Sequence, residues 1–181
     1  RAASLISSFK QVAVDQSNDS QRDFNMAQLI NEVLLSLRPN LKKTQHQVLI
    51  ECPPELVIQS KPGPINQILI NLIMNSLIHA FAKDDQGEMN IIVTLTGTHC
   101  QLRYRDNGVG VPEAIKKRIF DPFVTTRRGE GGSGLGLHLV YNLVTQALNG
   151  KISFDSTLGH GVDILIDFPV INKSHTSKDK A

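Results

Sequence analysis

The strongest restriction on the fold comes from a long apolar segment that also carries a polar stripe. Isoleucine and leucine recur in it at helical spacing, at Ile65, Ile68, Leu69, Leu72, Ile73, Leu77 and Ile78. Asn71, Asn75 and His79 follow one another at intervals of four, so they share one side of the same helix. Pro64 suits the first turn, where its missing N–H leaves no further bond unmade. The pattern predicts a helix over residues 64–80 that packs on a core and presents polar groups beside it.

The rest of the chain alternates helical and β-favouring segments. Apolar spacing predicts a helix from about Met26 that Pro39 bends or ends. The short runs 47–51 and 56–59 are expected to pair as a hairpin across Pro53-Pro54. Residues 89–96 and 101–105 are expected to form two adjacent strands across a turn, and residues 151–155 and 163–168 a last pair of strands. A further helix is expected at 134–148. This order favours a two-layer α/β sandwich, with a mixed, mostly antiparallel sheet covered by helices on one face, over a doubly wound parallel fold.

Composition limits the partners of the chain. The 181 residues hold 19 Lys+Arg and 17 Asp+Glu in scattered positions, which argues against binding nucleic acid or membranes through bulk charge. Aromatic residues make up 5%, so few rings are available to stack on bases. Cys52 and Cys100 form no Cys-x-x-Cys pair and are expected to be reduced thiols of an intracellular protein. The chain starts without Met and has no uninterrupted run of about 18 apolar residues, so we expect a soluble piece of a longer protein.

Four segments carry candidate chemistry, and the first is the asparagine pair. Asn71 and Asn75 lie one helical turn apart, where a carboxamide oxygen can coordinate Mg²⁺ and its nitrogen can donate to phosphate oxygens. Two ordinary asparagines on a helix surface would show the same spacing. The pair alone is therefore a weak signal.

The second segment is Asp106-Asn107-Gly108-Val109-Gly110, directly after a predicted strand. Its glycines allow the backbone to approach a planar ligand, and its carboxylate can accept a hydrogen bond from an exocyclic amine. A tight hairpin turn is the alternative, because Asn-Gly is a strong hairpin signal. A helical segment rather than a returning strand follows, which argues against the hairpin.

The third and fourth segments lie together. Ile119-Phe120-Asp121-Pro122-Phe123 is expected to anchor a loop to the core through its two rings, and Thr125-Thr126-Arg127-Arg128 follows it. Residues 129–137 place several glycines before an amphipathic helix, where free backbone N–H groups and the helix dipole can hold phosphates. This loop lacks the Lys-Ser/Thr ending of a P-loop, and a flexible linker is its alternative.

In this order the four segments resemble the N box, first glycine box, F box and second glycine box of the ATP-binding domain of sensor histidine kinases. The resemblance covers about residues 25–168. It implies the Bergerat fold, in which helices cover a mixed sheet and ATP lies between the long helix and a mobile lid. Residues 111–131 would form that lid.

The resemblance implies a role for each matching position. Asn75 would coordinate Mg²⁺, and Asn71 would contact the phosphates or the metal shell. Asp106 would bind the adenine amine, with Gly108 and Gly110 shaping the base pocket. The phosphates would be held by Gly132, Gly134 and Gly136. Further nucleotide contacts are expected from Val111, Phe123, Thr125, Thr126, Ser133, Leu135 and Leu137.

Two positions bear on the reaction. Related ATPases of the gyrase and heat-shock-chaperone type have Glu where Asn71 stands, and Asn cannot take a proton from water at neutral pH, which favours a kinase. Many sensor kinases have Lys or Arg where this chain has Ile78, and an aromatic ring where it has His79. His79 would stack on adenine or reach a phosphate, with helix packing as the alternative. Arg127 or Arg128 would supply the missing cation as a catalytic residue.

The resemblance also divides the chain. None of its histidines is followed by an acidic residue, so the phosphoacceptor is expected on a separate domain. Residues 1–14 are similar to the end of the dimerisation hairpin that carries it, with a free amphipathic tail as the alternative. We expect a linker at 15–22, the ATP-binding domain at 23–169 and a disordered tail at 170–181.

The expected function is transfer of the ATP γ-phosphoryl group to a histidine, and from there to a response-regulator receiver domain. The full-length protein would be a homodimer through the hairpin, and this part of it cytoplasmic, in a bacterial inner-membrane sensor kinase that binds no nucleic acid. The alternatives are a Bergerat-fold ATPase, a non-catalytic nucleotide-binding regulatory module, and a serine kinase that acts on an anti-sigma-factor antagonist.

Overall fold

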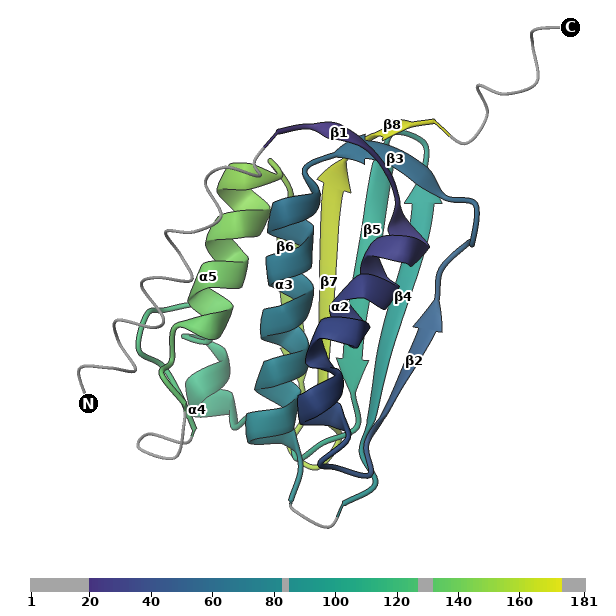
Figure 1. Cartoon of the computed structure of the whole chain (residues 1–181). Coiled ribbons are helices and arrows are strands. Elements are labelled where there is room, and N and C mark those ends of the chain that lie inside the picture. The colour runs from purple at the N-terminus through teal and green to yellow at the C-terminus, as the bar shows by residue number, and fades with distance from the viewer. Residues whose placement is uncertain (1–19, 83–84, 127–131, 174–181) are drawn as a thin grey trace, which may run out of the picture.

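Helices and strands form two layers in this computed structural model, which describes residues 20–82, 85–126 and 132–173. The helices lie on one face of a five-stranded sheet (Figure 1). A separate three-stranded sheet lies at one end of the layers (Figure 1). The predicted two-layer α/β sandwich is confirmed.

The main sheet is mixed and mostly antiparallel. Its strands, in spatial order, are β2 (Gln47–Glu51), β4 (Glu88–Thr96), β5 (His99–Asp106), β7 (Val162–Pro169) and β6 (Lys151–Ser156). β2 runs parallel to β4, and every other neighbouring pair is antiparallel. The predicted pairings of β4 with β5 and of β6 with β7 are confirmed.

Alternation along β5 separates the core from the open face of the sheet. Leu102 and Tyr104 are buried beneath the helices, whereas Arg103 and Arg105 lie on the opposite face. There Arg103 donates from Nε and Nη2 to the two oxygens of Asp163, and Arg105 Nε donates to Asp163 Oδ2. These hydrogen bonds lower the pKa of Asp163 to about 2.

Three helical segments cover the sheet. They are α2 (Met26–Leu41), α3 (Pro62–Asn75) continued by the π-helical turn η2 (Ser76–Ala80), and α5 (Gly136–Asn142) continued by the π-helical turn η3 (Leu143–Ala147). A short helix, α4 (Glu113–Lys116), lies within the expected lid. The Asn25 side chain caps α2 by accepting a hydrogen bond from the N–H of Gln28. Pro39 lies inside the last turn of α2. The predicted long helix to Ala80 is confirmed.

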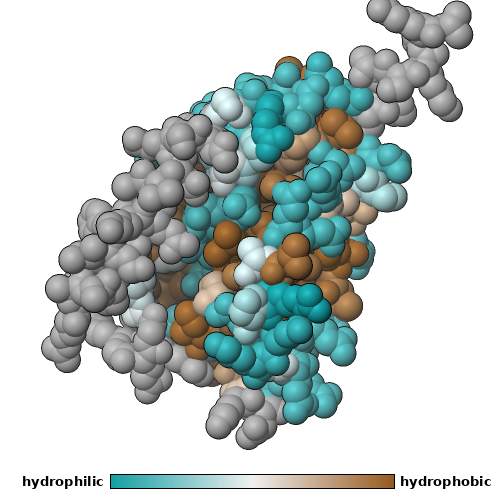
Figure 2. All heavy atoms as spheres, viewed as in Figure 1, coloured by the Kyte–Doolittle hydropathy of each residue, from teal (hydrophilic) through white to brown (hydrophobic). Residues whose placement is uncertain are grey.

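The core lies between the helices and the sheet. The apolar residues of α3 that face it have 0–1% of their surface exposed, namely Ile65, Ile68, Leu69, Leu72 and Ile73. Figure 2 shows mostly hydrophilic residues over the outer surface of the helical layer, with apolar residues between the helices. Within the described ranges, no helix combines the length and apolarity needed to cross a bilayer.

The predicted hairpin of residues 47–51 and 56–59 is wrong. β3 (Val57–Ser60) belongs to the smaller sheet, where it pairs antiparallel with β1 (Arg22–Asn25) and with β8 (Ile171–Asn172). β2 instead takes the edge of the main sheet beside β4. Pro53 and Pro54 separate the two strands, and proline lacks the N–H that a returning ladder would need.

The tail begins later than the sequence predicts. Val170 is buried, and its N–H donates to the carbonyl of Thr98 over 2.8 Å. The N–H of Lys173 donates to the carbonyl of Val57 over 3.0 Å, so the chain remains paired beyond residue 169. Residues 1–19 and 174–181, with the expected stub, most of the linker and the rest of the tail, lie outside the described residues.

Candidate functional site

A cavity of about 430 Å³ opens between the α3–η2 helix, the lid, the start of α5 and the ends of β5 and β7. Most of the predicted site residues line it: Asn71, Asn75, His79, Asp106, Gly110, Val111, Thr125, Thr126, Gly132, Ser133, Gly134, Leu135, Gly136 and Leu137. Gly108 and Phe123 do not line it. Arg127 and Arg128 lie outside the described residues. Segments far apart in the sequence therefore converge on one cavity.

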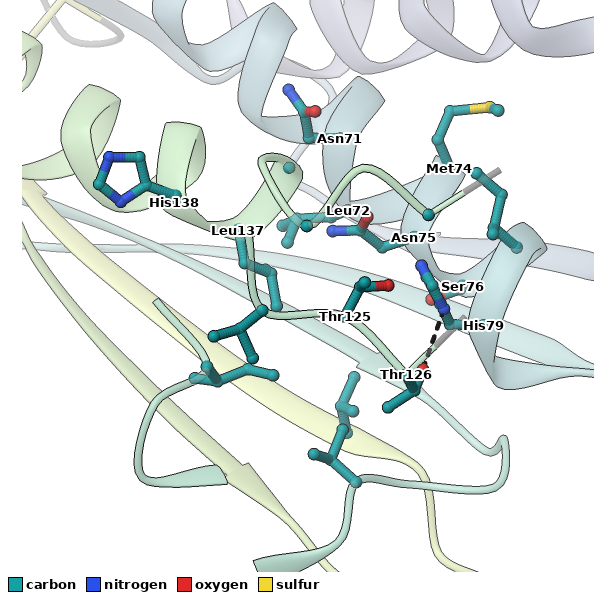
Figure 3. Close-up of a pocket in the computed structure, with 18 of the residues that line it drawn as sticks. Asn71, Leu72, Met74, Asn75, Ser76, His79, Thr125, Thr126, Leu137 and His138 are labelled. Atoms are coloured by element: carbon teal, nitrogen blue, oxygen red, sulfur yellow. Dashed lines mark hydrogen bonds between the residues drawn. The ribbon is translucent and has the colours of Figure 1, made fainter. Parts of the chain in front are cut away.

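Asn75 presents a buried polar group to this cavity (Figure 3). Its Nδ2 has no hydrogen-bond partner, the one such buried side-chain atom found in the described part of the chain. A Cβ on Gly136 would lie only 2.9 Å from Asn75 Oδ1, so any residue larger than glycine would displace this carboxamide. Because buried polar groups are normally paired, the site fits a polar ligand that completes Asn75.

The two other members of the polar stripe already have partners. Asn71 Nδ2 donates to the carbonyl of Gln67 over 2.8 Å, which leaves the carboxamide oxygen and the second N–H of Asn71 for other partners. His79 Nδ1 lies 3.0 Å from Thr126 Oγ1, a hydrogen bond that joins η2 to the lid (Figure 3). His79 therefore lines the cavity and contacts the lid.

Asp106 is buried at the end of β5, where both of its carboxylate oxygens accept hydrogen bonds. Oδ2 accepts from Ser76 Oγ over 2.6 Å. Oδ1 accepts from the N–H groups of Gly108 at 3.0 Å and Val162 at 3.3 Å. Burial raises the pKa of Asp106, and these three hydrogen bonds oppose that rise. The result is a desolvated carboxyl group facing the cavity.

The first glycine segment folds tightly around Asp106. Gly110 has φ +70°, and a Cβ there would lie 2.3 Å from the carbonyl of Thr157. Gly108 was expected to shape the base pocket, but it packs instead against Ala80, where an added Cβ would lie 2.5 Å from the Ala80 side chain. Ala80 itself lines the cavity, so Gly108 acts on the pocket through its neighbour.

The Phe120 ring anchors the F-box segment to the core. The Phe120 ring packs against Tyr141 and Phe154, with centroid distances of 5.4 and 6.2 Å. Phe123 is 59% exposed with φ +66°, so its expected contact with the nucleotide is not supported. Its N–H donates to the carbonyl of Gly134 over 2.9 Å, which joins the lid to the second glycine loop through the backbone.

The lining residues that were not predicted include Ser76, Tyr104 and His138. Ser76 and Tyr104 lie behind Asp106, and Tyr104 could have been recognised because it stands two residues before Asp106 on the same face of a strand. His138 lies on α5, where Nδ1–H donates to the carbonyl of Phe120 over 2.9 Å and Nε2 accepts from Asn142 Nδ2 over 3.2 Å. No local pattern in the sequence distinguishes His138 from other helical residues.

Comparisons with known proteins agree with this geometry. Residues 60–172 match the family described as "Histidine kinase-, DNA gyrase B-, and HSP90-like ATPase". Sporulation kinase A of Bacillus subtilis is 31% identical over 91% of this chain, and a putative sensor protein of Shewanella frigidimarina is 30% identical over 93% of it. The chain spans about a quarter of the length of these two relatives, 26% and 25% respectively.

Solved structures show the same fold. The nucleotide-free catalytic domain of histidine kinase ThkA is 28% identical and superposes with a TM-score of 0.71, covering 83% of this chain and 95% of that one. A structure of ThkA in complex with the response regulator protein TrrA shows the same fold, with a TM-score of 0.67 over 82% of this chain and 41% of that one, at 24% identity. The family match covers more than half of the chain and includes the whole cavity lining. The chain therefore belongs to the histidine kinase-, DNA gyrase B- and HSP90-like ATPase family, as a catalytic domain homologous to those of sensor histidine kinases.

Proposed function

We propose that this domain binds Mg²⁺ and ATP in the cavity and directs the γ-phosphoryl group to a histidine on a separate domain. One observation carries the proposal: the cavity has a buried carboxyl group, Asp106, on one side and an unpartnered carboxamide, Asn75, on another. A ligand that pairs with both groups must carry a hydrogen-bond donor at one end and anionic or metal-bound oxygens at the other. ATP with Mg²⁺ has that polarity.

Asp106 is the proposed partner of the adenine amine. Two backbone N–H groups and Ser76 hold the carboxylate in place, and one of its acceptor positions remains for a donor from the ligand. Apolar side chains complete this part of the lining, among them Val162 and Ile164 of β7. A flat, largely apolar base with one exocyclic amine suits such a pocket.

Asn75 and Asn71 are proposed to hold the metal and phosphate end. Rotation about the Cβ–Cγ bond lets the free end of the Asn75 carboxamide offer either an oxygen to a cation or an N–H to a phosphate. Asn71 uses one N–H on Gln67, so its oxygen can join the metal shell and its second N–H can donate to a phosphate oxygen. When bound, Mg²⁺ would neutralise the charge that develops on the phosphates.

The glycine loop before α5 is proposed to receive the phosphates. Gly136 starts the helix, and the first turn leaves backbone N–H groups without intrahelical acceptors. Thr126 and His79 join the lid to η2 at the mouth of the cavity. Arg127 and Arg128 remain the predicted source of a cation, since Ile78 lines the cavity without one.

Phosphotransfer rather than hydrolysis is proposed because the described lining offers no free carboxylate to activate water. Asp106 is the one carboxylate among those lining residues, and its oxygens already accept three hydrogen bonds. Asn71 cannot accept a proton at neutral pH. A Bergerat-fold ATPase is the second candidate, and release of phosphate by the isolated domain would favour it.

The proposed partners follow from the relatives, which are named as sensor proteins and kinases and of which this chain spans about a quarter. We propose that the phosphoaccepting histidine lies on a dimerisation hairpin of the full-length homodimer, and that a response-regulator receiver domain takes the phosphoryl group from it. We place this domain on the cytoplasmic side of the membrane, where ATP is available.

Calorimetry with ADP and Mg²⁺ on the Asp106→Asn variant tests the site. We expect at least a tenfold loss of affinity, because an amide presents a donor where the adenine amine needs an acceptor. Asp121→Asn is the matched control, since Asp121 pairs with Arg118 at the surface and does not line the cavity. Equal affinity of the wild type and the Asp106→Asn variant would refute the adenine assignment. Transfer of labelled phosphate from ATP to an added hairpin fragment carrying the upstream histidine tests the kinase activity.

A further inference from the structure

We infer that Ser76 and Tyr104 are positioning residues that hold Asp106 as an ionised acceptor with a single open site, and thereby select a 6-amino purine over a 6-oxo purine. The inference rests on the proposed function, because it assigns the base specificity of the same cavity. It concerns two residues that do not belong to any of the predicted site positions.

The two hydroxyl groups form a chain that ends on Asp106. Tyr104 Oη donates to Ser76 Oγ over 2.7 Å, and Ser76 Oγ donates to Asp106 Oδ2 over 2.6 Å. The three residues are 1%, 3% and 7% exposed, so water does not compete for these bonds. Ser76 comes from η2 and the other two come from β5, so the chain also joins the long helix to the sheet.

The direction of the chain is determined by the protonation state of Asp106. A carboxylate can only accept, so the Ser76 proton must point to it, and the Ser76 oxygen is then free to accept from Tyr104. If Asp106 were protonated and donated to Ser76, the Ser76 proton would turn towards Tyr104. The observed network therefore satisfies all three buried groups when Asp106 is ionised.

The same bonds leave one open acceptor position on Asp106. A carboxylate offers about four lone-pair sites, and Asp106 uses two on Oδ1, for Gly108 and Val162, and one on Oδ2, for Ser76. The fourth can accept an N–H from the 6-amino group of adenine. A 6-oxo group would place an oxygen against this carboxylate oxygen, and neither could donate.

Without the hydroxyl chain, Asp106 would lose its ionised state more readily. Burial raises its pKa, and the hydrogen bond from Ser76 is the largest of the effects that lower it. A protonated Asp106 could donate to a 6-oxo group, which reverses the preference between bases. The chain therefore links the pH dependence of binding to the choice of base.

The groups that contact Asp106 from each neighbouring element are few. η2 contributes Ser76, the turn after β5 contributes the N–H of Gly108, and β7 contributes the N–H of Val162, while Tyr104 of β5 acts on Asp106 through Ser76. Tyr104 is the titratable group among them, and burial raises its pKa further above its usual value. His79 and His138 line the same cavity but remain in every variant below, so differences between variants report on Asp106.

The experiment measures binding of ADP and of inosine diphosphate, each with Mg²⁺, between pH 5 and pH 8. The main variant is Ser76→Ala/Tyr104→Phe, because Ser76→Ala alone would leave the Tyr104 hydroxyl buried without a partner. Ser36→Ala is the matched control, since Ser36 Oγ bonds only within α2, to the carbonyl of Val33. Thermal melting confirms that each variant is folded.

For the double variant we expect the low-pH loss of ADP binding to move up by about one pH unit, which makes ADP affinity about tenfold lower at the acid end. The loss at pH 8 should be smaller, and the preference for ADP over inosine diphosphate should fall. Tyr104→Phe alone keeps the bond from Ser76 to Asp106, so it should shift the profile in the same direction by less. This single variant is the test if the double variant does not fold.

Superimposable pH profiles with an unchanged preference for ADP would overturn the inference. A uniform loss of affinity at every pH, with that preference retained, would also overturn it, since a purely structural role predicts that result. The Asp106→Asn variant separates this inference from the proposed function. If Asp106→Asn weakens ADP binding and the double variant behaves as the wild type, only the role of Ser76 and Tyr104 fails.

Discussion

Replacing Gly136 by Ala should separate the stability of the domain from its ability to bind a nucleotide with its metal. Gly136 is the first residue of α5 and does not have a positive φ, so Ala can adopt its backbone conformation. Ala also has the higher helix propensity, which stabilises a helix by up to about 1 kcal/mol relative to Gly. On folding alone, the substitution should be neutral or slightly stabilising.

The contact with Asn75 predicts the opposite effect on binding. The new Cβ would lie 2.9 Å from Asn75 Oδ1 and 3.3 Å from Nδ2, closer than ordinary contact. The carboxamide must therefore move by about half an ångström, and Mg²⁺ tolerates little change because it requires near-ideal octahedral geometry. We expect affinity for ADP with Mg²⁺ to fall at least tenfold, or about 1.4 kcal/mol. Without Mg²⁺ the loss should be smaller.

Calorimetry with ADP, with Mg²⁺ and with a chelator, and urea unfolding measure the two effects. Gly97→Ala is the control: Gly97 has φ +59° and open space around its Cβ position. That variant should lose about 1 kcal/mol of stability, because L-residues are strained at positive φ, and should keep its affinity. Wild-type affinity of Gly136→Ala for ADP with Mg²⁺ would refute the proposed role of Asn75.

Two further substitutions test the surroundings of the site. Asp163→Asn should lower the free energy of unfolding at pH 7 by about 1 kcal/mol. This magnitude comes from the lowering of the Asp163 pKa from 3.8 to about 2, reduced because the side chain is partly exposed and solvent screens the ion pair. Because that pKa is lowered, the contribution is present above about pH 4 and disappears as pH falls towards 2, so urea unfolding should show the difference from wild type shrinking in acid. Gly161→Ala should destabilise the domain by about 2 kcal/mol or more, since Gly161 has φ +75° and its Cβ would overlap the carbonyl of Asp106. Its thermal midpoint should fall by several degrees, and an unchanged midpoint would contradict the close approach.

Local patterns in the sequence predict most of the fold. The 3.6-residue period identifies the long helix, and alternation of apolar and polar residues identifies strands β4 to β7. The pairings of β4 with β5 and of β6 with β7 are then predictable, because consecutive strands joined by a short turn pair with each other. The parallel pairing of β2 with β4 could not be predicted in this way. Alternation shows which face of a strand is buried, but it does not show which distant strand lies beside it.

The sequence predicts which residues belong to the candidate site better than it predicts where their side chains point. Most of the residues predicted from the four boxes line the cavity, yet a residue's place in a box does not show that Phe123 faces outward or that Gly108 packs on Ala80. The link between Tyr104 and Ser76 also requires a helix and a strand to be placed in three dimensions. Contacts between a helix and a strand leave no periodic pattern in the sequence, so they cannot be predicted from it.

The small sheet gives the domain a mechanical connection between its two ends. β3 lies between β1 and β8, so the first and last strands of the described fold both pair with the same strand. β3 ends at Ser60, and α3 begins at Pro62, on the helix that carries Asn71 and Asn75. A pull on the chain before Arg22 would thus load β3 in shear and reach the start of this helix across a single residue.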